Sequence, residues 1–518
     1  MIRRWWHWLL ERPARRLGPV LALAAAVAVL AAVILPGGSS SPKRVSAGPT
    51  TSAGPSTQAA STTTAPPSTT SGTAASRTSS AGATVATRPA STAAPTTRPA
   101  PTYPWPQFGQ GPGRSGIAAA GPSPAGAHLH WRTALDGAVY AEPVSGNGLI
   151  VVATENDTVY ALRSGDGSVA WQQHLGAPIP GSSLPCGDID PSGITGTPAI
   201  DPATGTVYVV AFVQPQRHDL VALDLASGQP RWRRAIDPPG LSASVEQQRS
   251  ALILASGRVY VPFGGLYGDC GAYKGAVVAS ALNGSGPVQA WIAPAQREAG
   301  VWAPGGGAVD PGGNLFVATG NGSSTDPAAY DGGNSVFRLT SALQQADSFA
   351  PADWAALAAS DTDLGSTSPL LVSNGEVFIA GKDGNGYLLN GQHLGGIGGQ
   401  QFSSPACAGG AAFGGSAWAN PVVVLDCNSG PVGLRIDRPG HFTGAWSATG
   451  GLGGSPSVAS GVAWVAQRRG HLVALDVGSG AVRADLSLGG SVPGFPSPAV
   501  LPDLVVAPAG NAVAAFGD

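Results

Sequence analysis

The chain has 518 residues with 75 Gly and 46 Pro, and only 11% of its residues are charged. This Gly and Pro content excludes long uninterrupted helices over most of the chain. The formal net charge is −2, but residues 105–518 carry 18 basic and 29 acidic side chains, a net charge of −11. Such an acidic domain is not expected to bind nucleic acid, because that binding depends on neutralising phosphates with Lys and Arg.

The chain begins with an arginine-rich tail over residues 1–18, MIRRWWHWLLERPARRLG, followed by an apolar segment at 19–36. This segment is close to the lower length limit for crossing a bilayer. Basic residues before it predict a cytoplasmic N-terminus, with the remainder outside the cell membrane. A cleaved signal peptide is the alternative, but PGGSSS follows instead of an A-x-A site. We expect an uncleaved single-pass signal anchor, with the cytoplasmic membrane as its partner.

Residues 37–104 are almost entirely Ser, Thr, Ala, Pro and Gly with scattered basic residues and no acidic residue. Such a segment cannot bury enough apolar surface to offset the entropy lost on ordering. It is expected to be a disordered linker that carries the domain at 105–518.

A thirteen-residue pattern occurs three times in that domain, as VYALRSGDGSVAW (159–171), LVALDLASGQPRW (220–232) and LVALDVGSGAVRA (472–484). A short apolar run, a turn and a second run predict strand, turn, strand. The copies share a Leu, a Gly and, in two cases, a final Trp, and a further Trp takes the corresponding position in a similar strand at 128–137. These positions are Leu162, Gly167, Trp171, Leu223, Gly228, Trp232, Leu475, Gly480 and Trp131.

Less regular copies raise the number of units to eight, with expected starts at residues 142, 197, 250, 306, 368, 404, 455 and 497. Each unit averages about 52 residues, slightly more than a four-stranded propeller blade. The last unit has room for only three strands, and HLHWRTALDG (128–137) reads as the missing outer strand. We therefore expect an all-β, eight-bladed β-propeller over 105–518, closed by an N-terminal strand that removes an exposed edge.

The motifs ALRSGDGSVAW, ALDLASGQPRW and ALDVGSGAV, and the lead-in WPQFGQGPGRSG (105–116), resemble the quinoprotein-like, pyrroloquinoline quinone (PQQ) repeat β-propellers. That family contains dehydrogenases and non-enzymatic scaffold proteins such as BamB. The resemblance implies that the repeat is structural, with its Leu between blades, its Gly in the turn and its Trp against a neighbouring blade.

Cys186, Cys270, Cys407 and Cys427 are the four cysteines. An exported domain lies in an oxidising compartment, so two disulfides are expected, Cys186–Cys270 and Cys407–Cys427. Metal ligation is the rival interpretation, but the sequence has no C-x-x-C and no nearby His cluster.

Other polar motifs are weaker. Asp188 and Asp190 could ligate Ca²⁺, although an Asp-capped turn is commoner. His128 and His130 are expected to form a solvated edge pair, and Gly111-x-Gly113-x-x-Gly116 lacks the strand and helix of a dinucleotide site. DWAALAASD (353–361) predicts a short helix between the fourth and fifth units.

The expected role is a non-catalytic binding or scaffolding module outside the membrane, with an envelope protein or glycan as partner and no cofactor. Three Lys against abundant Arg, Ala, Gly and Pro suggest a GC-rich genome and an actinobacterial envelope protein. The alternative is an oxidoreductase that uses PQQ and Ca²⁺ on alcohols or sugars. The family resemblance implies a vicinal Cys-Cys pair for such an enzyme, and this sequence has none.

Overall fold

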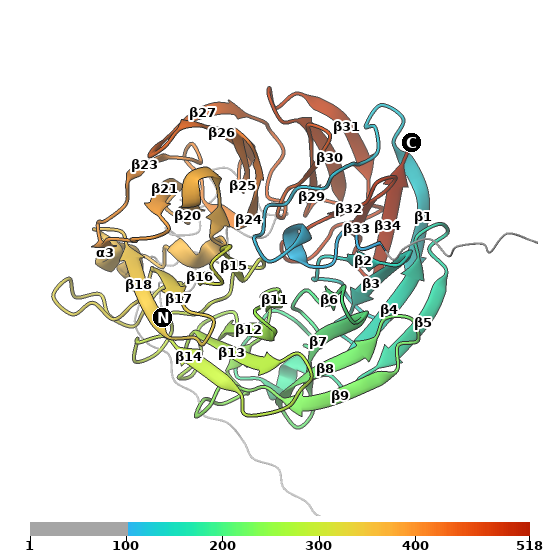
Figure 1. Ribbon diagram of the computed structural model, residues 1–518, viewed down its shortest axis with the longest axis horizontal. Helices are drawn as coiled ribbons and strands as arrows, with labels where there is room; N and C mark the ends of the chain where they lie inside the picture. The colour runs from blue at the N-terminus through green and yellow to red at the C-terminus, as the bar shows by residue number, and fades with distance from the viewer. Residues whose placement is uncertain (1–101) are drawn as a thin grey trace, which may run out of the picture. The chain divides into compact units, whose positions relative to one another are not determined.

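The computed structural model describes residues 102–518, so the predicted tail, anchor and nearly all of the linker lie outside the described residues. Eight β-sheets, antiparallel except for one short parallel pair, form blades arranged around a ring (Figure 1). This confirms the predicted all-β, eight-bladed propeller. Within residues 102–518, no helix is long and apolar enough to cross a membrane.

Blades 1 to 4 follow chain order, and each is given from its innermost to its outermost strand. Blade 1 contains β2 (Val144–Gly146), β3 (Leu149–Ala153), β4 (Thr158–Arg163) and β5 (Val169–His174). Blade 2 contains β6 (Ala199–Asp201), β7 (Thr206–Val213), β8 (Arg217–Asp224) and β9 (Pro230–Ala235). Blade 3 contains β11 (Ile253–Ala255), β12 (Arg258–Gly265), β13 (Ala276–Ala281) and β14 (Gln289–Ile292), and β10 (Glu246–Gln247) also pairs with β12. Blade 4 contains β15 (Gly307–Val309), β16 (Leu315–Ala318), β17 (Val336–Leu339), β18 (Gln345–Ala350) and the parallel β22 (Gly396–Ile397).

Blades 5 to 8 complete the ring. Blade 5 contains β19 (Leu370–Leu371), β20 (Glu376–Ala380), β21 (Asn385–Asn390) and β23 (Phe402–Pro405). Blade 6 contains β24 (Ala412–Ala419), β25 (Val422–Cys427), β26 (Gly430–Arg438) and β27 (His441–Ser447). Blade 7 contains β28 (Ser457–Ala459), β29 (Val462–Gln467), β30 (His471–Asp476) and β31 (Val482–Ser487). Blade 8 contains β32 (Ala499–Val500), β33 (Val505–Pro508), β34 (Ala512–Gly517) and β1 (His128–Ala134).

The burial of each strand follows its place in the blade. The second strand of blade 2, TVYVVAFV, is buried along its whole length, because neighbouring blades cover both of its faces. The outer strand of the same blade, PRWRRA, alternates exposed and half-buried side chains. Continuous apolar runs therefore mark inner strands, and alternating runs mark outer strands.

The N-terminal strand β1 closes the ring. It pairs antiparallel with β34, from His128 opposite Gly517 to Ala134 opposite Ala512. The predicted role of 128–137 as the outer strand of the last blade is therefore confirmed. One expected start is wrong: Ser404 and Pro405 belong to the outer strand β23 of blade 5, not to blade 6. The glycine-rich stretch before β23 first places β22 beside blade 4 and only then returns to blade 5. The outer strand of blade 5 therefore comes later in the chain than expected.

The final Trp of one blade covers the turn glycine of the next. Trp171 of blade 1 lies over Gly228 of blade 2, where an added Cβ would be 2.5 Å from the indole, and its Nε1 donates to the Leu225 carbonyl at 2.8 Å. Trp131 makes the same contact with Gly167 and donates to the Ser164 carbonyl at 2.9 Å. Gly284 lies under Trp232 and Gly480 under Trp446 in the same way. The repeated pattern thus connects successive blades.

The lead-in before β1 crosses the centre of the ring (Figure 1). The carbonyls of Trp105, Pro106, Pro112, Ser115 and Gly116 accept hydrogen bonds from innermost-strand amides of blades 1, 2, 4, 6 and 7, respectively. The side chain of Gln107 accepts from the Leu254 amide of blade 3 at 2.9 Å. One short segment therefore joins six of the eight blades. The glycine motif at 111–116 is part of this structural segment.

Two buried charged side chains, Arg114 of the lead-in and Glu142, interact electrostatically near the centre of the ring. Arg114 is 3% exposed and donates to the carbonyls of Gly307 and Leu252 at 3.0 and 2.9 Å. Glu142 is 2% exposed and accepts from Trp105 Nε1 and from the Gly109 amide. Burial raises the pKa of Glu142 to about 8, although these hydrogen bonds and the positive charge of Arg114 act to lower it. Burial also lowers the pKa of Arg114 to about 10.

Loops divide unequally between the two faces of the ring. Because strand direction alternates within a blade, the turns between second and third strands share one face with the connections to the next blade. We call this the loop face. It carries the predicted helix between blades 4 and 5, which the structure contains as α3 (Trp354–Ala359). Short 3₁₀ turns complete the helical elements of the described chain: η1 (Phe108–Gln110), η2 (Gly181–Ser183), η3 (Leu364–Ser366) and η4 (Ser373–Gly375).

Both predicted disulfides form, and both lie on the loop face. Cys186–Cys270 joins the β5–β6 connection to the β12–β13 loop, with 6.2 Å between the Cα atoms. Cys407–Cys427 joins the β23–β24 connection to the end of β25, with 5.7 Å between the Cα atoms. Among the described residues no cysteine is free.

The Trp171–Gly228 contact predicts a specific loss of stability on replacing Gly228 with Ala. Gly228 and Gly257 have the same φ of +72°, but a Cβ at Gly257 would meet nothing within 4 Å. Gly228→Ala and Gly257→Ala therefore strain the backbone equally, but only Gly228→Ala places a Cβ against the indole of Trp171. We expect Gly228→Ala to lower the free energy of urea unfolding by roughly 1–3 kcal/mol more than Gly257→Ala. Equal losses in the two variants would show that the indole contact does not restrict this position.

The raised pKa of Glu142 predicts a pH-dependent stability. Its pKa of about 8 in the folded state exceeds the ordinary carboxyl value of 4.5, so between these values the folded state holds a proton that the unfolded state has released. Stability should therefore fall as pH rises through this window. Melting temperatures between pH 5 and 8.5 should decline less steeply in Glu142→Gln than in the wild type. The exposed-site control Asp503→Asn should retain the wild-type slope, and an unchanged slope in Glu142→Gln would contradict the assignment.

The disulfides should differ in their contribution to stability. Their sequence separations are 84 and 20 residues. Chain-entropy arithmetic gives about 4–5 kcal/mol for the longer loop and about 3 kcal/mol for the shorter one. Urea unfolding of the paired variants Cys186→Ala/Cys270→Ala and Cys407→Ala/Cys427→Ala should show this order. Cys407 and Cys427 are buried, so replacing them with Ala also leaves a cavity, which lowers the free energy of unfolding further. A larger decrease for this pair than for Cys186 and Cys270 would mean that packing outweighs loop closure.

Candidate functional site

A network of charged and amide side chains lies on the loop face between blades 4 and 5. Lys382 Nζ lies 2.5 Å from Asp363 Oδ2 and 3.6 Å from Asp361 Oδ1. Asn321 donates from its backbone to Asp363 at 2.6 Å and from its side chain to Asp361 at 2.8 Å. Burial lowers the pKa of Lys382, but the charges of Asp363 and Asp361 outweigh it and the net pKa is raised. The ammonium is therefore held in its charged form.

Trp302 joins this network to an aromatic and cationic cluster. Lys382 Nζ lies 5.6 Å and the Arg249 guanidinium 5.7 Å from the centre of the Trp302 rings. Arg249 also lies 5.3 Å from the Phe495 ring, which stacks on Phe413 at 5.3 Å. These distances are within cation–π range. We call Lys382, Asp363, Trp302, Arg249 and Phe495 the cation–aromatic cluster.

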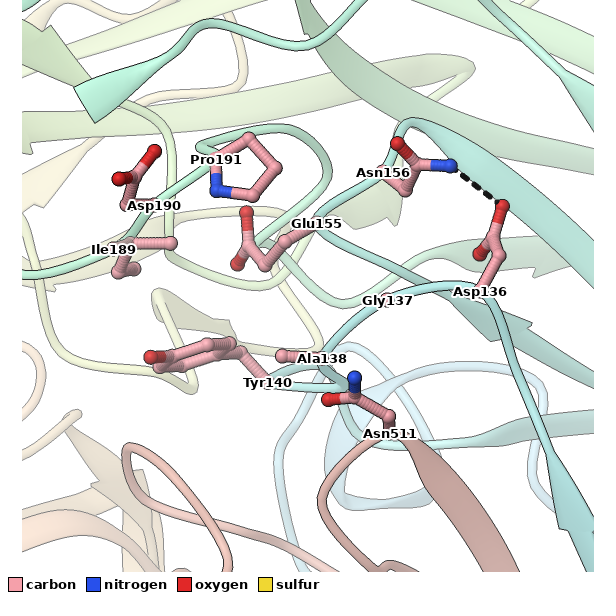
Figure 2. A pocket seen from close by; sticks show the side chains of 10 residues that line it. All are labelled: Asp136, Gly137, Ala138, Tyr140, Glu155, Asn156, Ile189, Asp190, Pro191 and Asn511. Carbon is pink, nitrogen blue, oxygen red and sulfur yellow. Dashed lines mark hydrogen bonds between the residues drawn. The ribbon is translucent and has the colours of Figure 1, made fainter. Parts of the chain in front are cut away.

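A cavity of about 240 Å³ lies on the loop face where blades 8, 1 and 2 meet (Figure 2). The β1–β2 connection, the β3–β4 turn, the β5–β6 connection and the β33–β34 turn all contribute to its wall. The lining residues are Asp136, Gly137, Ala138, Tyr140, Glu155, Asn156, Ile189, Asp190, Pro191 and Asn511.

Two carboxyl groups of this cavity differ in their electrostatics. Burial raises the pKa of Glu155 to about 7. Hydrogen bonds from the Gly193 amide and Thr195 and the positive charge of Arg249 act to lower it but do not outweigh burial. Burial alone would raise the pKa of Asp136, but hydrogen bonds from Thr158, Asn156 and Thr154 outweigh it and the pKa is lowered. Asp136 is therefore anionic at neutral pH, whereas Glu155 titrates near it.

The predicted polar candidates are only partly brought together. Asp190 lines the cavity, and its Oδ1 accepts from the Gly181 amide at 2.8 Å, as in a capped turn. Asp188 lies nearby on the same connection and is exposed. His128 and His130 lie on β1 at the outer edge of blade 8, with ring centres 4.7 Å apart. In residues 102–518 no group of three His, Cys, Asp or Glu side chains could hold a metal ion.

Sequence reasoning missed the cation–aromatic cluster and the role of Glu155. Asp361-x-Asp363 falls at the end of the predicted helical segment, and Lys382 lies in an ordinary turn, so neither forms a motif with the other. Glu155 was visible only as part of the turn Glu155-Asn156-Asp157. The expected blade starts at residues 306 and 368 could have indicated that the turns at 319–335 and 381–384 belong to neighbouring blades.

The residues of the cation–aromatic cluster do not fit a PQQ and Ca²⁺ site. Trp302 and the two cations could contact a planar anion, but both oxygens of Asp363 already accept hydrogen bonds, from Asn321 and Lys382. Asn321 and Lys382 also contact Asp361, both at its Oδ1. The ammonium of Lys382 thus takes the position between carboxylates that a cation would need. We derive no catalytic step from this arrangement.

Comparisons with known proteins agree with the fold. Residues 123–306 match the family model described as outer membrane protein assembly factor BamB. BamB of Yersinia pestis is 26% identical over 170 residues, which cover 25% of this chain and 40% of that protein. BamB of Xanthomonas campestris pv. campestris is 32% identical over 106 residues, covering 20% and 23%. The matches thus span less than half the length of these curated relatives.

Solved structures are similar over most of the described chain. The quinohemoprotein alcohol dehydrogenase ADHIIG of Pseudomonas putida HK5 superposes with a TM-score of 0.61 at 14% identity, covering 80% of each chain. BamB of Moraxella catarrhalis gives a TM-score of 0.52 at 13% identity, covering 76% of this chain and all of that one. At these identities the likeness establishes the fold alone. The repeated motifs and the ring of eight blades agree with these matches: the described chain is an eight-bladed β-propeller, and its residues 123–306 are similar to the BamB family of PQQ-repeat propellers.

Proposed function

We propose that the protein is a non-catalytic binding or scaffolding module of the cell envelope, anchored in the membrane through residues 19–36. The observation that carries this proposal is that both disulfides fix connections of one face, the loop face. Loops restrained in advance lose less entropy on binding a partner. The disulfides also suit an extracytoplasmic compartment, where they persist.

The loop face also differs chemically from the opposite face. It carries long connections, the cavity and the cation–aromatic cluster, whereas the opposite face carries the short turns of the repeat. In those turns Asp224 and Asp476 accept hydrogen bonds from the backbone just after them, so their polar groups are used internally. We therefore place the partner, an envelope protein or glycan, on the loop face. The relatives' description as outer membrane assembly factors supports a protein partner.

Photo-cross-linking from the two faces tests this proposal in intact cells. A photoreactive residue would replace exposed Ser182 or Ala328 on the loop face, and exposed Arg438 on the opposite face as the matched control. We expect a discrete cross-linked product from Ser182 or Ala328 and none from Arg438. The product should disappear in the Cys186→Ala/Cys270→Ala variant. The same products from both faces, or none from either, would contradict the proposal.

The second candidate is a PQQ-dependent oxidoreductase acting on alcohols or sugars, favoured by Trp302 between two cations. Purified full-length protein would be mixed with PQQ and Ca²⁺, and dye reduction followed with an alcohol and sugar panel. Since the ammonium of Lys382 already neutralises the Asp363 carboxylate and takes the place that Ca²⁺ would need, we expect no saturable PQQ binding and no turnover. Turnover that Trp302→Ala abolishes would establish the enzyme and overturn the non-catalytic assignment.

A further inference from the structure

The cavity at the junction of blades 8, 1 and 2 contains a buried acceptor that no group of residues 102–518 satisfies. Glu155 is 2% exposed. Its Oε2 accepts from the Gly193 amide at 2.7 Å and from Thr195 Oγ1 at 3.1 Å. Its Oε1 has no hydrogen-bond partner among the described residues. Figure 2 shows this carboxylate in the middle of the lining residues. A buried polar atom without a partner is costly, so a donor that enters the cavity would be favoured.

The charge of the cavity wall selects the kind of donor. Asp136, Glu155 and Asp190 contribute three carboxyl groups, and none of the lining residues is Lys or Arg. Asp157 is also buried, and its charge and that of Glu155 repel each other. Two positive charges act on the wall without lining the cavity: Arg249 acts on Glu155 and Tyr140, and Arg468 acts on Tyr140. A concave wall with one sign of charge attracts ligands of the opposite sign, so the donor should be cationic.

The geometry favours an organic cation over a metal ion. The oxygens of Asp136 already accept from Thr154, Asn156 and Thr158, and Asp190 Oδ1 accepts from the Gly181 amide. No convergent set of free carboxylates remains among the lining residues. The volume of about 240 Å³ is also larger than an ion needs and slightly below that of drug-sized sites. Asn156, Asn511 and Tyr140 add amide and phenol groups that could contact hydroxyls.

We propose that this cavity binds a small polyol that carries a protonated primary amine, of amino-sugar size, with its ammonium donating to Glu155 Oε1. The amine meets the unsatisfied carboxylate, and the hydroxyl groups face the amide and phenol side chains of the wall. This inference rests on the proposed function, because it assigns a ligand class to the loop face. It is independent of the cation–aromatic cluster.

Isothermal titration calorimetry of the purified full-length chain tests the inference with three probes, glucosamine, glucose and calcium chloride. We expect saturable binding of glucosamine, at least about tenfold weaker binding of glucose, and no binding of Ca²⁺. Glu155→Gln preserves the shape of the side chain and its acceptor for Gly193, and should weaken glucosamine binding at least about tenfold. Asn511→Leu, an exposed change at the cavity wall, should weaken it without affecting folding.

Glu246→Gln is the matched control. Glu246 is also buried, its Oε2 also lacks a partner and burial raises its pKa to about 8, but it lies outside the cavity. It should leave glucosamine affinity unchanged. Equal affinities for glucosamine and glucose, binding of Ca²⁺ in place of the amine, or an unaltered affinity in Glu155→Gln would each overturn the inference. If one of these results is found but cross-linking still occurs from the loop face alone, the ligand inference fails and the proposed binding or scaffolding function stands.

Discussion

The pairing of β1 with β34 is the constraint on which the rest of the structure depends. The three strands that the chain supplies last leave one edge of blade 8 unpaired, and His128–Ala134 fills it from the other end of the domain. In a closed ring of blades, every blade packs between two neighbours. The lead-in that precedes β1 strengthens this closure, because it bonds to innermost strands on both sides of the closing blade.

Closure also fixes how blades meet. An indole over a glycine can form only where the turn backbone adopts a positive φ, as at Gly167, Gly228 and Gly480. Any side chain there would both strain the turn and displace the indole. The indole also donates a hydrogen bond to a carbonyl of the neighbouring blade, which fixes the orientation of the ring in a contact that is otherwise apolar. The result is a fixed angular step between the blades that share this contact.

The repeat and the candidate site occupy opposite faces of the ring. The repeated turns use their Asp and Ser side chains to stabilise their own backbone, which leaves little chemistry for a ligand. The loop face instead buries carboxyl groups such as Glu155 and Asp157 at the tops of strands, where desolvation raises their pKa values. Buried carboxyl groups of this kind reduce stability unless a partner compensates them. Their concentration on the face with restrained loops is the reason to look for a ligand there.

The sequence by itself determined the fold class, the number of blades and the closing strand, because these follow from local periodicity, turn residues and a repeat whose copies share the same packing. It also predicted both cysteine pairs, since Cys186 and Cys270 fall in long loops expected on one face, and Cys407 and Cys427 fall where neighbouring strands could bring them together. It did not determine the exact start of blade 6, where a glycine-rich loop moves the outer strand of blade 5 along the chain. Only the tertiary structure decided the candidate site. Lys382 reaches Asp363 and Glu155 reaches the cavity across blade boundaries, and no local spacing in the chain records which turns of neighbouring blades come together.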